Sequence, residues 1–416
     1  MAVTNDLVTD RRVQRHCKAL REAGYAVRTV CRTDLTVRHS RGWRFYAGFN
    51  FKLRRRLLNI NPDIIWANDT DTLLGCRLAA RKLNAPLVMD AHELFPEVPE
   101  IQHKPLVKWV WRTIERCMMP KCDALLTVCQ SIADYYKRKY GVEMTVVRNL
   151  NEELGIRNEE LEISKHSTPK TLLYQGHVNL GRGVDWAIDA LEWLNDCQLV
   201  IAGGGDLLDE MKAYASSKLW ADRISFTGRL TPDELAPLTA KADVGLVMLE
   251  DMGLSYHYAL PNRIGDFVAA GVPMVVSDLP EMAAVIRRFG VGEVMAAPGA
   301  TALAEAVKRV LAREWHEADF AEARADMDWN KEKQKLIDCI NTFIKHALQS
   351  PINPLLCRLA GRTVAGVQES RHSTVEVAHT HIQHRGVAKD VQQEMVVVRM
   401  VPDTCHKHLH VPADGG

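Results

Sequence analysis

The sequence has no uninterrupted apolar run long enough to cross a membrane, and its first residues lack the apolar core of a secretory signal peptide. A formal net charge of only +1 argues against binding nucleic acid over an extended surface. The 10 cysteines are scattered singly, without a CxxC pair, so neither a disulfide framework nor a zinc site is expected. These absences predict a cytoplasmic protein with reduced thiols, whose membrane contact is limited to a peripheral one at the inner face.

Aromatic residues are absent from the last part of the chain, which contains no Phe, Trp or Tyr after residue 351. Seven of the 16 histidines fall in this part, at spacings that would allow zinc binding. A segment without aromatic anchors and without a sustained period struggles to offset the entropy lost on ordering. Residues 348–416 are therefore predicted to be a disordered or artefactual tail.

The rest of the chain alternates short apolar runs with helical patterns. In the first half the predicted strands lie at 1–4, 25–31, 63–67, 86–89 and 124–128, and the predicted helices at 11–23, 72–83 and 131–140. After a hydrophilic linker, strands are predicted at 171–175, 198–202, 224–227, 244–248 and 274–277. This βαβ rhythm predicts an α/β protein with two doubly wound parallel-sheet domains, 1–150 and 171–347, joined by the linker 151–170. Because ligands bind at the carboxyl ends of parallel strands, we expect a site in a cleft between the two domains.

Residues 254–273 form the most informative segment. A polar, aromatic loop runs into Pro261, and a short helix follows that Gly271 and Pro273 should close. Arg263 and Asp266 lie three residues apart, on one face near the start of that helix. The amide groups of a helix start suit a diphosphate, and an acidic side chain one turn further could hold ribose hydroxyls. The alternative is a surface helix with an Arg263–Asp266 ion pair.

Two glycine-bearing loops follow strands of the same domain. Gly181 and Arg182 precede a helix that should begin near Val184, and three glycines at 203–205 follow the strand at 198–202. Glycine lets the backbone approach a ligand closely, although tight turns also use glycine routinely. Together with Arg263 and Asp266, the loops collect groups suited to a nucleotide at successive strand ends.

At this point the sequence resembles a known family, the retaining GT-B glycosyltransferases of family 4, also called group 1. The second half is similar to that family in YQGHVNLGRG, LVIAGGGD, ISFTGRL, ADVGLV and LPNRIGDFVAAGVPMVVSDLPE. The first half is similar to its acceptor domain in DRRVQR, LREAGYAV, NPDIIWAND and APLVMDAHELFPE. The resemblance covers residues 3–343 and implies two Rossmann-like domains with a nucleotide-sugar between them.

The resemblance also implies roles on the donor side. Arg182 would contact the donor diphosphate, Arg263 would lie in the donor loop, and Asp266 would be the second acid of the E-x7-E pattern that holds the ribose. His92 would lie near the transferred sugar. The expected catalytic residues are therefore His92, Arg182 and Arg263, and the expected donor-binding residues are Gly181, Arg182, Gly203, Gly204, Asn262, Arg263 and Asp266.

On the acceptor side the expected residues are Asp10, Arg11 and Glu93. Asp10 is also predicted to cap the helix that begins at Arg11, and Arg12 to face the cleft or only water. The sequence departs from the family pattern at Tyr258, which replaces the first acid of E-x7-E, and at His177, where an arginine is usual. This departure leaves the contacts to the sugar ring unassigned.

Arginines and helix-start amides can stabilise the charge on a departing diphosphate, so neither a metal nor another cofactor is expected. The co-substrate would be a UDP- or GDP-linked sugar. The string at 69–71, Asp-Thr-Asp, looks like a metal-binding DxD, but its position at the start of a predicted helix favours N-capping.

Residues 41–58 interleave five aromatic side chains with arginines and a lysine, and residues 103–116 repeat this combination. Such a combination suits an anionic membrane surface and a lipid-linked acceptor. The alternative is a pair of amphipathic helices whose aromatic residues belong to the core.

The sequence thus predicts a glycosyltransferase that moves a sugar from a nucleotide-diphosphate donor to a glycan or lipid-linked acceptor, with no nucleic acid as partner. Two alternatives remain at this stage. One is a nucleotide-sugar 2-epimerase of the same fold, and the other is a non-catalytic nucleotide-binding partner subunit.

Overall fold

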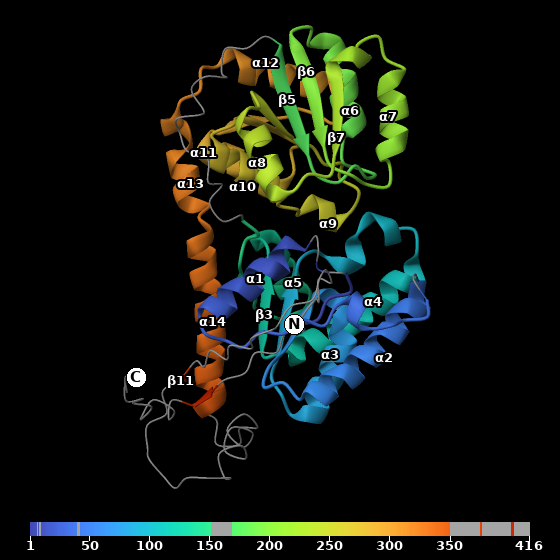
Figure 1. The fold of residues 1–416 in the computed structure, drawn as a ribbon, viewed down its shortest axis with the longest axis vertical. Coiled ribbons are helices and arrows are strands. Elements are labelled where there is room, and N and C mark those ends of the chain that lie inside the picture. Colours follow the sequence, from blue (N-terminus) through green and yellow to red (C-terminus); the bar gives the residue numbers. More distant parts are fainter. Residues whose placement is uncertain are drawn as a thin grey trace, which may run out of the picture.

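The computed structural model describes residues 1–5, 7, 10–39, 42–150 and 169–349, with two short pairs at 375–376 and 401–402. Figure 1 shows two α/β units stacked on each other, the N-terminal one in blue to teal and the C-terminal one in green to orange. The long helix α14 (Trp329–Gln349) leaves the second unit and packs along the first, against α1 (Arg11–Glu22). The predicted pair of doubly wound parallel-sheet units is confirmed.

The N-terminal unit contains a four-stranded parallel sheet in the order β1-β2-β3-β4. Its strands are β1 (Ile65–Asn68), β2 (Leu87–Ala91), β3 (Ala124–Thr127) and β4 (Thr145–Val146). Its remaining α-helices are α2 (Gly42–Ile60), α3 (Asp69–Leu83), α4 (Pro105–Met118) and α5 (Gln130–Tyr140). The predicted strands at 1–4 and 25–31 are wrong as full strands. They are reduced to single parallel bridges, in which Ala2 pairs with Val30 and with Ala67.

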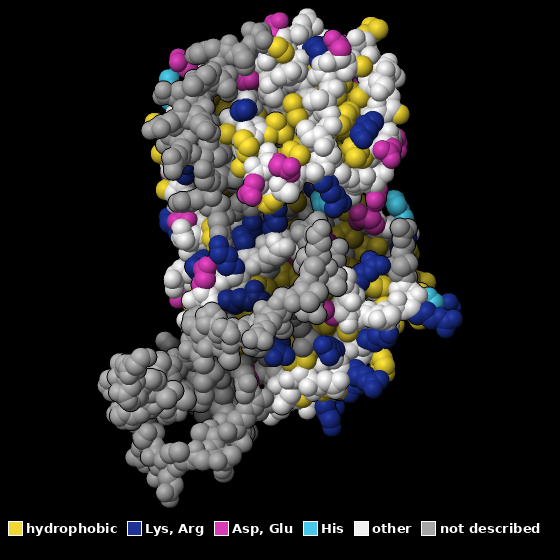
Figure 2. Space-filling view, viewed as in Figure 1, with side chains coloured by type: hydrophobic (Ala, Val, Ile, Leu, Met, Phe, Trp, Pro, Cys, Tyr) yellow, Lys and Arg dark blue, Asp and Glu magenta, His cyan; other side chains and the backbone are white. Residues whose placement is uncertain are grey.

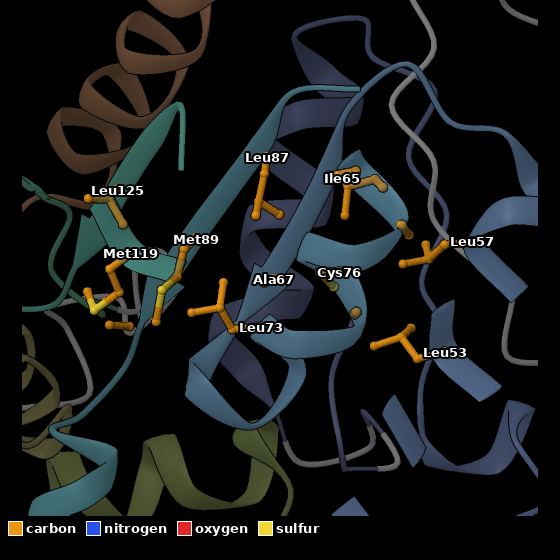
Figure 3. Packing of buried hydrophobic residues seen from close by; sticks show 14 of the residues in the cluster. Leu53, Leu57, Ile65, Ala67, Leu73, Cys76, Leu87, Met89, Met119 and Leu125 are labelled. Atoms are coloured by element: carbon orange, nitrogen blue, oxygen red, sulfur yellow. The ribbon is translucent and has the colours of Figure 1, made fainter. Parts of the chain in front are cut away.

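Side chains of this sheet alternate between two hydrophobic layers. Ile65, Leu87 and Met89 face the helices α2 and α3 and share one hydrophobic cluster with Leu53 and Leu73 of those helices (Figure 3). The intervening residues pack on the opposite face against α1 and α14; they include Trp66, Val88 and Leu126. A parallel sheet covered on both faces needs apolar residues at every position, which explains the continuous apolar runs of the sequence.

The C-terminal unit contains a six-stranded parallel sheet in the order β10-β9-β8-β5-β6-β7. Its strands are β5 (Lys170–Gln175), β6 (Cys197–Ala202), β7 (Ile224–Gly228), β8 (Val244–Val247), β9 (Met274–Val276) and β10 (Gly292–Val294). The five predicted strands of this half are confirmed to within one residue at each end, and the three-residue edge strand β10 was not predicted.

The helices of the C-terminal unit cover both faces of that sheet (Figure 1). They are α6 (Val184–Ala190), α7 (Leu208–Ser216), α8 (Pro232–Ala240), α9 (Leu254–His257), α10 (Arg263–Ala270), α11 (Pro280–Phe289), α12 (Ala300–Ala312) and α13 (Ala321–Asp326). Helix α10 ends at Gly271, which adopts φ +67° as predicted. Its N-cap is Asn262, so Pro261 lies just before the helix and not in its first turn.

Strand β5 pairs with β6 on one side and with β8 on the other. The chain therefore reverses its direction of winding at β5, and the loops after β5 and β8 diverge at that point. This topological switch point is where open α/β sheets bind ligands.

Most of the histidine-rich tail lies outside the described residues, as does the linker apart from its last two residues. Within the tail, β11 (Val375–Glu376) pairs antiparallel with β12 (Val401–Pro402). No helix among the described residues is both long and apolar enough to span a bilayer.

Candidate active site

Three arginines meet near the carboxyl end of β5. Burial lowers the pKa of His177, which follows β5, and the charges of Arg182, Arg229 and Arg263 lower it further. Arg229, which follows β7, was not singled out from the sequence. Its signal was its position directly after a strand, whereas Arg182 was found further along, in the glycine-bearing loop between β5 and α6. The three side chains give the switch point a concentrated positive charge, which suits an anionic ligand.

Arg263 is buried and anchored to the ends of two strands. Its Nη1 donates to the carbonyl oxygen of Gln175 at 2.8 Å, and its Nη2 donates to that of Met248 at 3.2 Å. The guanidinium carbon lies 4.9 Å from the centroid of the Tyr174 ring. Burial lowers the pKa of Arg263, and Arg182 lowers it further. The side chain of Arg263 thus links the carboxyl end of β5 to that of β8.

Arg182 is positioned differently, beside the start of α6. Its guanidinium carbon lies 4.7 Å from the centroid of the Tyr256 ring, a cation–π contact that orients the side chain. Its Nε is buried and has no hydrogen-bond partner among the described residues. A buried guanidinium donor without an acceptor has capacity for an external anion.

The glycine loops pack tightly on each other. A Cβ on Gly203 would lie 1.7 Å from the carbonyl oxygen of Gly176, and Val178 N donates to Gly204 O at 3.1 Å. A Cβ on Gly181 would lie 2.5 Å from Met252 Sδ. The close packing of neighbouring loops therefore accounts for glycine at 203 and 181. A Cβ on Gly204 would meet only the side chain of Arg229.

Asp266 belongs to a buried polar network. Its Oδ2 accepts from Gln175 Nε2 at 2.8 Å, and Gln175 Oε1 accepts from Thr239 Oγ1 at 2.8 Å. Gln175 thus joins β5 to both α8 and α10. The carboxylate predicted to hold a ribose lies directly behind the end of β5, beside the residue whose carbonyl anchors Arg263. Asn262, the N-cap of α10, makes no side-chain capping bond.

His92, at the end of β2, is held between two carboxylates. Asp69 accepts from the His92 backbone N at 2.7 Å and lies 3.2 Å from Nδ1, while Asp90 Oδ2 lies 3.3 Å from Nε2. Burial alone would lower the pKa of His92, but the two carboxylates outweigh it and raise that pKa to about 9. His92 is therefore an imidazolium at neutral pH.

Glu93 connects this group to the opposite unit. Its Oε2 lies 3.5 Å from Ser255 Oγ, at the hydrogen-bond limit, and Ser255 belongs to α9 of the C-terminal unit. Burial and the charge of Asp69 raise the pKa of Glu93 to about 7, although His92 and Arg182 oppose the rise. Arg182 of the C-terminal unit is thus near enough for its charge to act on Glu93 of the N-terminal unit.

Asp10 caps α1, as predicted, since its Oδ1 accepts from Val13 N at 3.1 Å. Arg11 is partly exposed at the first position of that helix. Arg12 faces neither the cleft nor water, contrary to the prediction. It is buried and forms a two-pronged ion pair with Asp90, at 3.0 and 2.6 Å, because a buried carboxylate requires a buried cation.

The N-capping predicted for the string at 69–71 is wrong. The N-cap of α3 is Asn68, which makes no side-chain capping bond, and Asp69 and Asp71 lie inside the first turn. Asp69 binds His92, and Asp71 accepts from Thr4 Oγ1. Burial raises the pKa of Asp71 to about 8. Both carboxylates therefore accept hydrogen bonds from residues distant in sequence, and neither caps the backbone of α3.

Tyr258, in place of the first acid of the family pattern, packs on the hydrophobic core of the N-terminal unit. Its carbonyl oxygen lies 3.2 Å from the thiol sulfur of Cys129. Nearby, Glu281 of α11 accepts from Ser131 N at 2.7 Å, so it caps the start of α5 from the opposite unit. The position without a carboxylate has become part of the contact between the two units.

Comparisons with known proteins identify both halves. Residues 9–150 match the family described as Glycosyltransferase Family 4, and residues 169–313 match Glycosyl transferases group 1. A phosphatidyl-myo-inositol mannosyltransferase of Mycobacterium leprae is 31% identical over 178 residues, which are 39% of this chain and 43% of that protein. A glycogen synthase of Mycobacterium tuberculosis is 28% identical over 232 residues, 52% of this chain and 53% of that protein. The chain spans about half the length of such curated relatives.

Solved structures share the arrangement of the two units. A sucrose-phosphate synthase from Thermosynechococcus elongatus has a TM-score of 0.65 at 16% identity, covering 80% of this chain and 93% of that one. The Anabaena protein HepE in complex with UDP-glucose has a TM-score of 0.57 at 14% identity, covering 71% of this chain and 82% of that one. The two family matches and the shared fold together show that this chain belongs to the family 4, group 1 glycosyltransferases of the GT-B fold.

Proposed function

We propose that this protein transfers a sugar from a nucleotide-diphosphate donor to a glycan or lipid-linked acceptor, with retention of configuration and without a metal. The observation that carries the proposal is that Arg182, from the switch point of the donor sheet, and His92 both act by their charges on Glu93 of the N-terminal unit. The unused Nε of Arg182 supports a diphosphate ligand at this place.

In the proposed reaction the bond between the anomeric carbon and the diphosphate oxygen breaks, and its electron pair leaves with the diphosphate. Arg182 stabilises that charge, and the charges of Arg229 and Arg263 lie close enough to add to its field. The acceptor hydroxyl oxygen forms the new bond to the anomeric carbon. Its proton passes to Glu93, whose pKa of about 7 suits a general base at neutral pH.

His92 is assigned the place beside the transferred sugar. Asp69 and Asp90, one at each ring nitrogen, would fix the orientation of the imidazolium beside that sugar. Asp266, which is bonded to Gln175 at the end of β5, is assigned to binding the ribose of the donor. Asp10 and Arg11 at the start of α1 are assigned to the acceptor side.

Donors of both kinds, UDP- and GDP-linked, belong in the assay. The transferase should release a nucleoside diphosphate only when an acceptor is present, and in equal amount to the glycoside formed. An epimerase would change the sugar without any acceptor, and a non-catalytic subunit would do neither. Glu93→Gln should lower kcat by about 100-fold or more and leave donor binding within about twofold. Unchanged turnover in this variant would remove Glu93 from the mechanism.

We also propose a peripheral membrane contact through residues 41–58, at the inner face of the membrane. In α2 the two predicted alternatives apply to different residues: Phe45 and Phe49 are core, whereas Trp43 and Phe51 are exposed. Figure 2 shows Lys and Arg side chains gathered on the part of the surface where Figure 1 places α2 and α3. Sedimentation with anionic vesicles should fall for the pair Trp43→Ser and Phe51→Ser, while vesicles of neutral lipid should bind neither protein. Equal sedimentation of the pair and the wild type would contradict the contact.

A further inference from the structure

A second concentration of positive charge lies outside the donor site, in the N-terminal unit. Its centre is Glu97, the last residue of the short 3-10 helix η2 (Phe95–Glu97) that follows β2. Lys108 Nζ lies 2.6 Å from one carboxylate oxygen of Glu97. Arg112 donates to the other oxygen through Nε at 3.0 Å and through Nη2 at 2.5 Å. Both cations come from α4, one turn apart.

A third cation joins the same carboxylate from α5. Lys139 Nζ lies 3.7 Å from Glu97 Oε1, and the hydroxyl of Tyr135 lies 3.3 Å from that atom. Lys108 also donates to Gln102 Oε1 at 2.7 Å. Three cations therefore share one carboxylate, whose two oxygens are already occupied by several donors.

A second carboxylate, Glu115, offsets the positive charge only in part, since three cations face two carboxylates. Glu115 is buried beneath the cluster and accepts from the hydroxyls of Thr70, Tyr136 and Tyr140, at 3.0, 2.9 and 2.8 Å. Burial raises the pKa of Glu115 in spite of these bonds. Glu115 therefore lies on the interior side of the cations, where its charge acts on Lys139.

The carboxylate of Glu97 is more deeply buried than the three cations around it. The side chain of Glu97 is 2% exposed, whereas those of Lys108, Lys139 and Arg112 are 17%, 24% and 43% exposed. Burial lowers the pKa of Lys139, and the charges of Arg112 and Lys108 lower it further, although Glu115 and Glu97 oppose this change. The carboxylates lie inside and the cations, which outnumber them, are the more exposed groups, so an external anion would relieve the repulsion between the cations.

We propose that Lys108, Arg112 and Lys139 form a phosphate-binding site on the N-terminal unit, a site that goes beyond the proposed sugar transfer. A guanidinium fork with two ammonium groups and a phenol matches an anion with several oxygens. The backbone of Glu97 approaches Gly253 of the opposite unit, so the site lies near the edge of the interface on the acceptor side. Its phosphate belongs either to a soluble phosphorylated compound or to a lipid headgroup.

The test uses the full chain carrying Arg182→Ala, so that the donor site binds the probe more weakly than in the wild type. Calorimetric titration with inorganic pyrophosphate should show binding. The double variant Arg112→Gln/Lys139→Gln should weaken that binding by about tenfold or more. Arg116→Gln, an exposed change on the same helix, is the matched control and should leave the affinity within about twofold. Pyrophosphate affinity that is equal in the double variant and in the control would overturn the proposal.

Glu97→Gln gives a test of opposite sign. It removes the competing carboxylate and should raise pyrophosphate affinity severalfold, whereas cations that serve only to neutralise Glu97 would gain none. Vesicles containing phosphatidic acid distinguish the two sources. Stronger binding to these vesicles than to pyrophosphate, lost in the double variant, identifies a lipid phosphate; binding to pyrophosphate alone identifies a soluble one. These binding measurements do not depend on sugar transfer, so a protein without transferase activity would give the same results and the two proposals are tested independently.

Discussion

The Asp90 carboxylate contacts the rings of two histidines whose pKa values shift in opposite directions. It lies 3.2 Å from His16 Nδ1 and 3.3 Å from His92 Nε2. Burial and the charge of Arg12 lower the pKa of His16 to about 4, whereas Asp69 and Asp90 raise that of His92 to about 9. His16 is enclosed by the core beside Trp66 and Trp329, while His92 has the second carboxylate of Asp69. One carboxylate thus stands between a neutral ring and a charged one.

The two histidines predict losses of stability on both sides of pH 6.5. The pKa of folded His92 lies above its unfolded value, so its contribution is complete below about pH 6.5 and is lost as the pH rises to about 9. The variant His92→Gln should therefore show a smaller decline in the free energy of unfolding over this range. Chemical denaturation at a series of pH values measures it, and parallel curves for the two proteins would contradict the assignment.

On the acid side the sign is reversed. The pKa of folded His16 lies below its unfolded value, so stability falls as the pH drops from 6.5 towards 4. His16→Phe keeps an aromatic ring beside Trp329 and removes the titration. Its free energy of unfolding should decline less than that of the wild type over this range. An equal decline in the two proteins would place the acid sensitivity elsewhere.

The glycines at 203 and 204 should differ in their tolerance of a methyl group. Gly203→Ala should lower the free energy of unfolding by about 2–4 kcal/mol. The new Cβ would collide with the carbonyl oxygen of Gly176, and the backbone of residue 203 has φ +158°, which favours glycine. Gly204→Ala meets only the flexible side chain of Arg229 and should stay within about 1 kcal/mol of the wild type. Thermal unfolding of the matched pair checks the difference, and equal melting temperatures would refute it.

The connection between the two units should depend on Arg148. This residue donates to Glu332 of α14 through its backbone N at 2.9 Å and its Nε at 2.8 Å, and it pairs with Asp326 at 2.5 Å. Arg148→Met leaves the buried Glu332 with Lys335 as its remaining cation, and should cost about 2–4 kcal/mol. Adding Glu332→Gln should recover part of that loss. A double variant no better than the single one would mean that the pair acts only through packing.

Much of the fold could be predicted because the apolar runs of a doubly covered sheet are continuous and their boundaries are polar. Strands 171–175 and 198–202 are the best examples, and β5 and β6 occupy them almost completely. The short pairings of Ala2 could not be predicted, because a single bridge has no periodicity. The capping of α1 by Asp10 was predictable since it is local in sequence.

The site was less predictable, because its chemistry depends on contacts between distant residues. A glycine-bearing loop after a strand pointed to Arg182, and position directly after a strand would have pointed to Arg229. Nothing in the sequence indicates that Asp69 would turn from its own helix to His92, or that Gln175 would bind Asp266. The residues that surround Glu97 come from two separate helices, α4 and α5, and the sequence pointed only to the basic residues of α4, as part of a membrane surface.

Removal of Arg263 and removal of Arg182 should differ in their effect on stability. Arg263→Ala removes hydrogen bonds to two strand ends and should lower the free energy of unfolding by about 2–4 kcal/mol. Arg182→Ala loses mainly its contact with Tyr256 and should change it by less than about 1 kcal/mol. Denaturation curves of both variants test this, and a larger loss for Arg182→Ala would reverse the assignment of anchor and ligand-binding residue.

The most direct measurement is calorimetric binding of a panel of UDP- and GDP-linked sugars to the wild type, to Arg182→Ala and to Arg309→Ala, a surface control. We expect at least one sugar nucleotide to bind the wild type and the control alike, and Arg182→Ala to weaken this binding by about tenfold or more at unchanged stability. Equal affinity in all three proteins, or no binding by the wild type across the panel, would contradict a donor diphosphate at the end of β5.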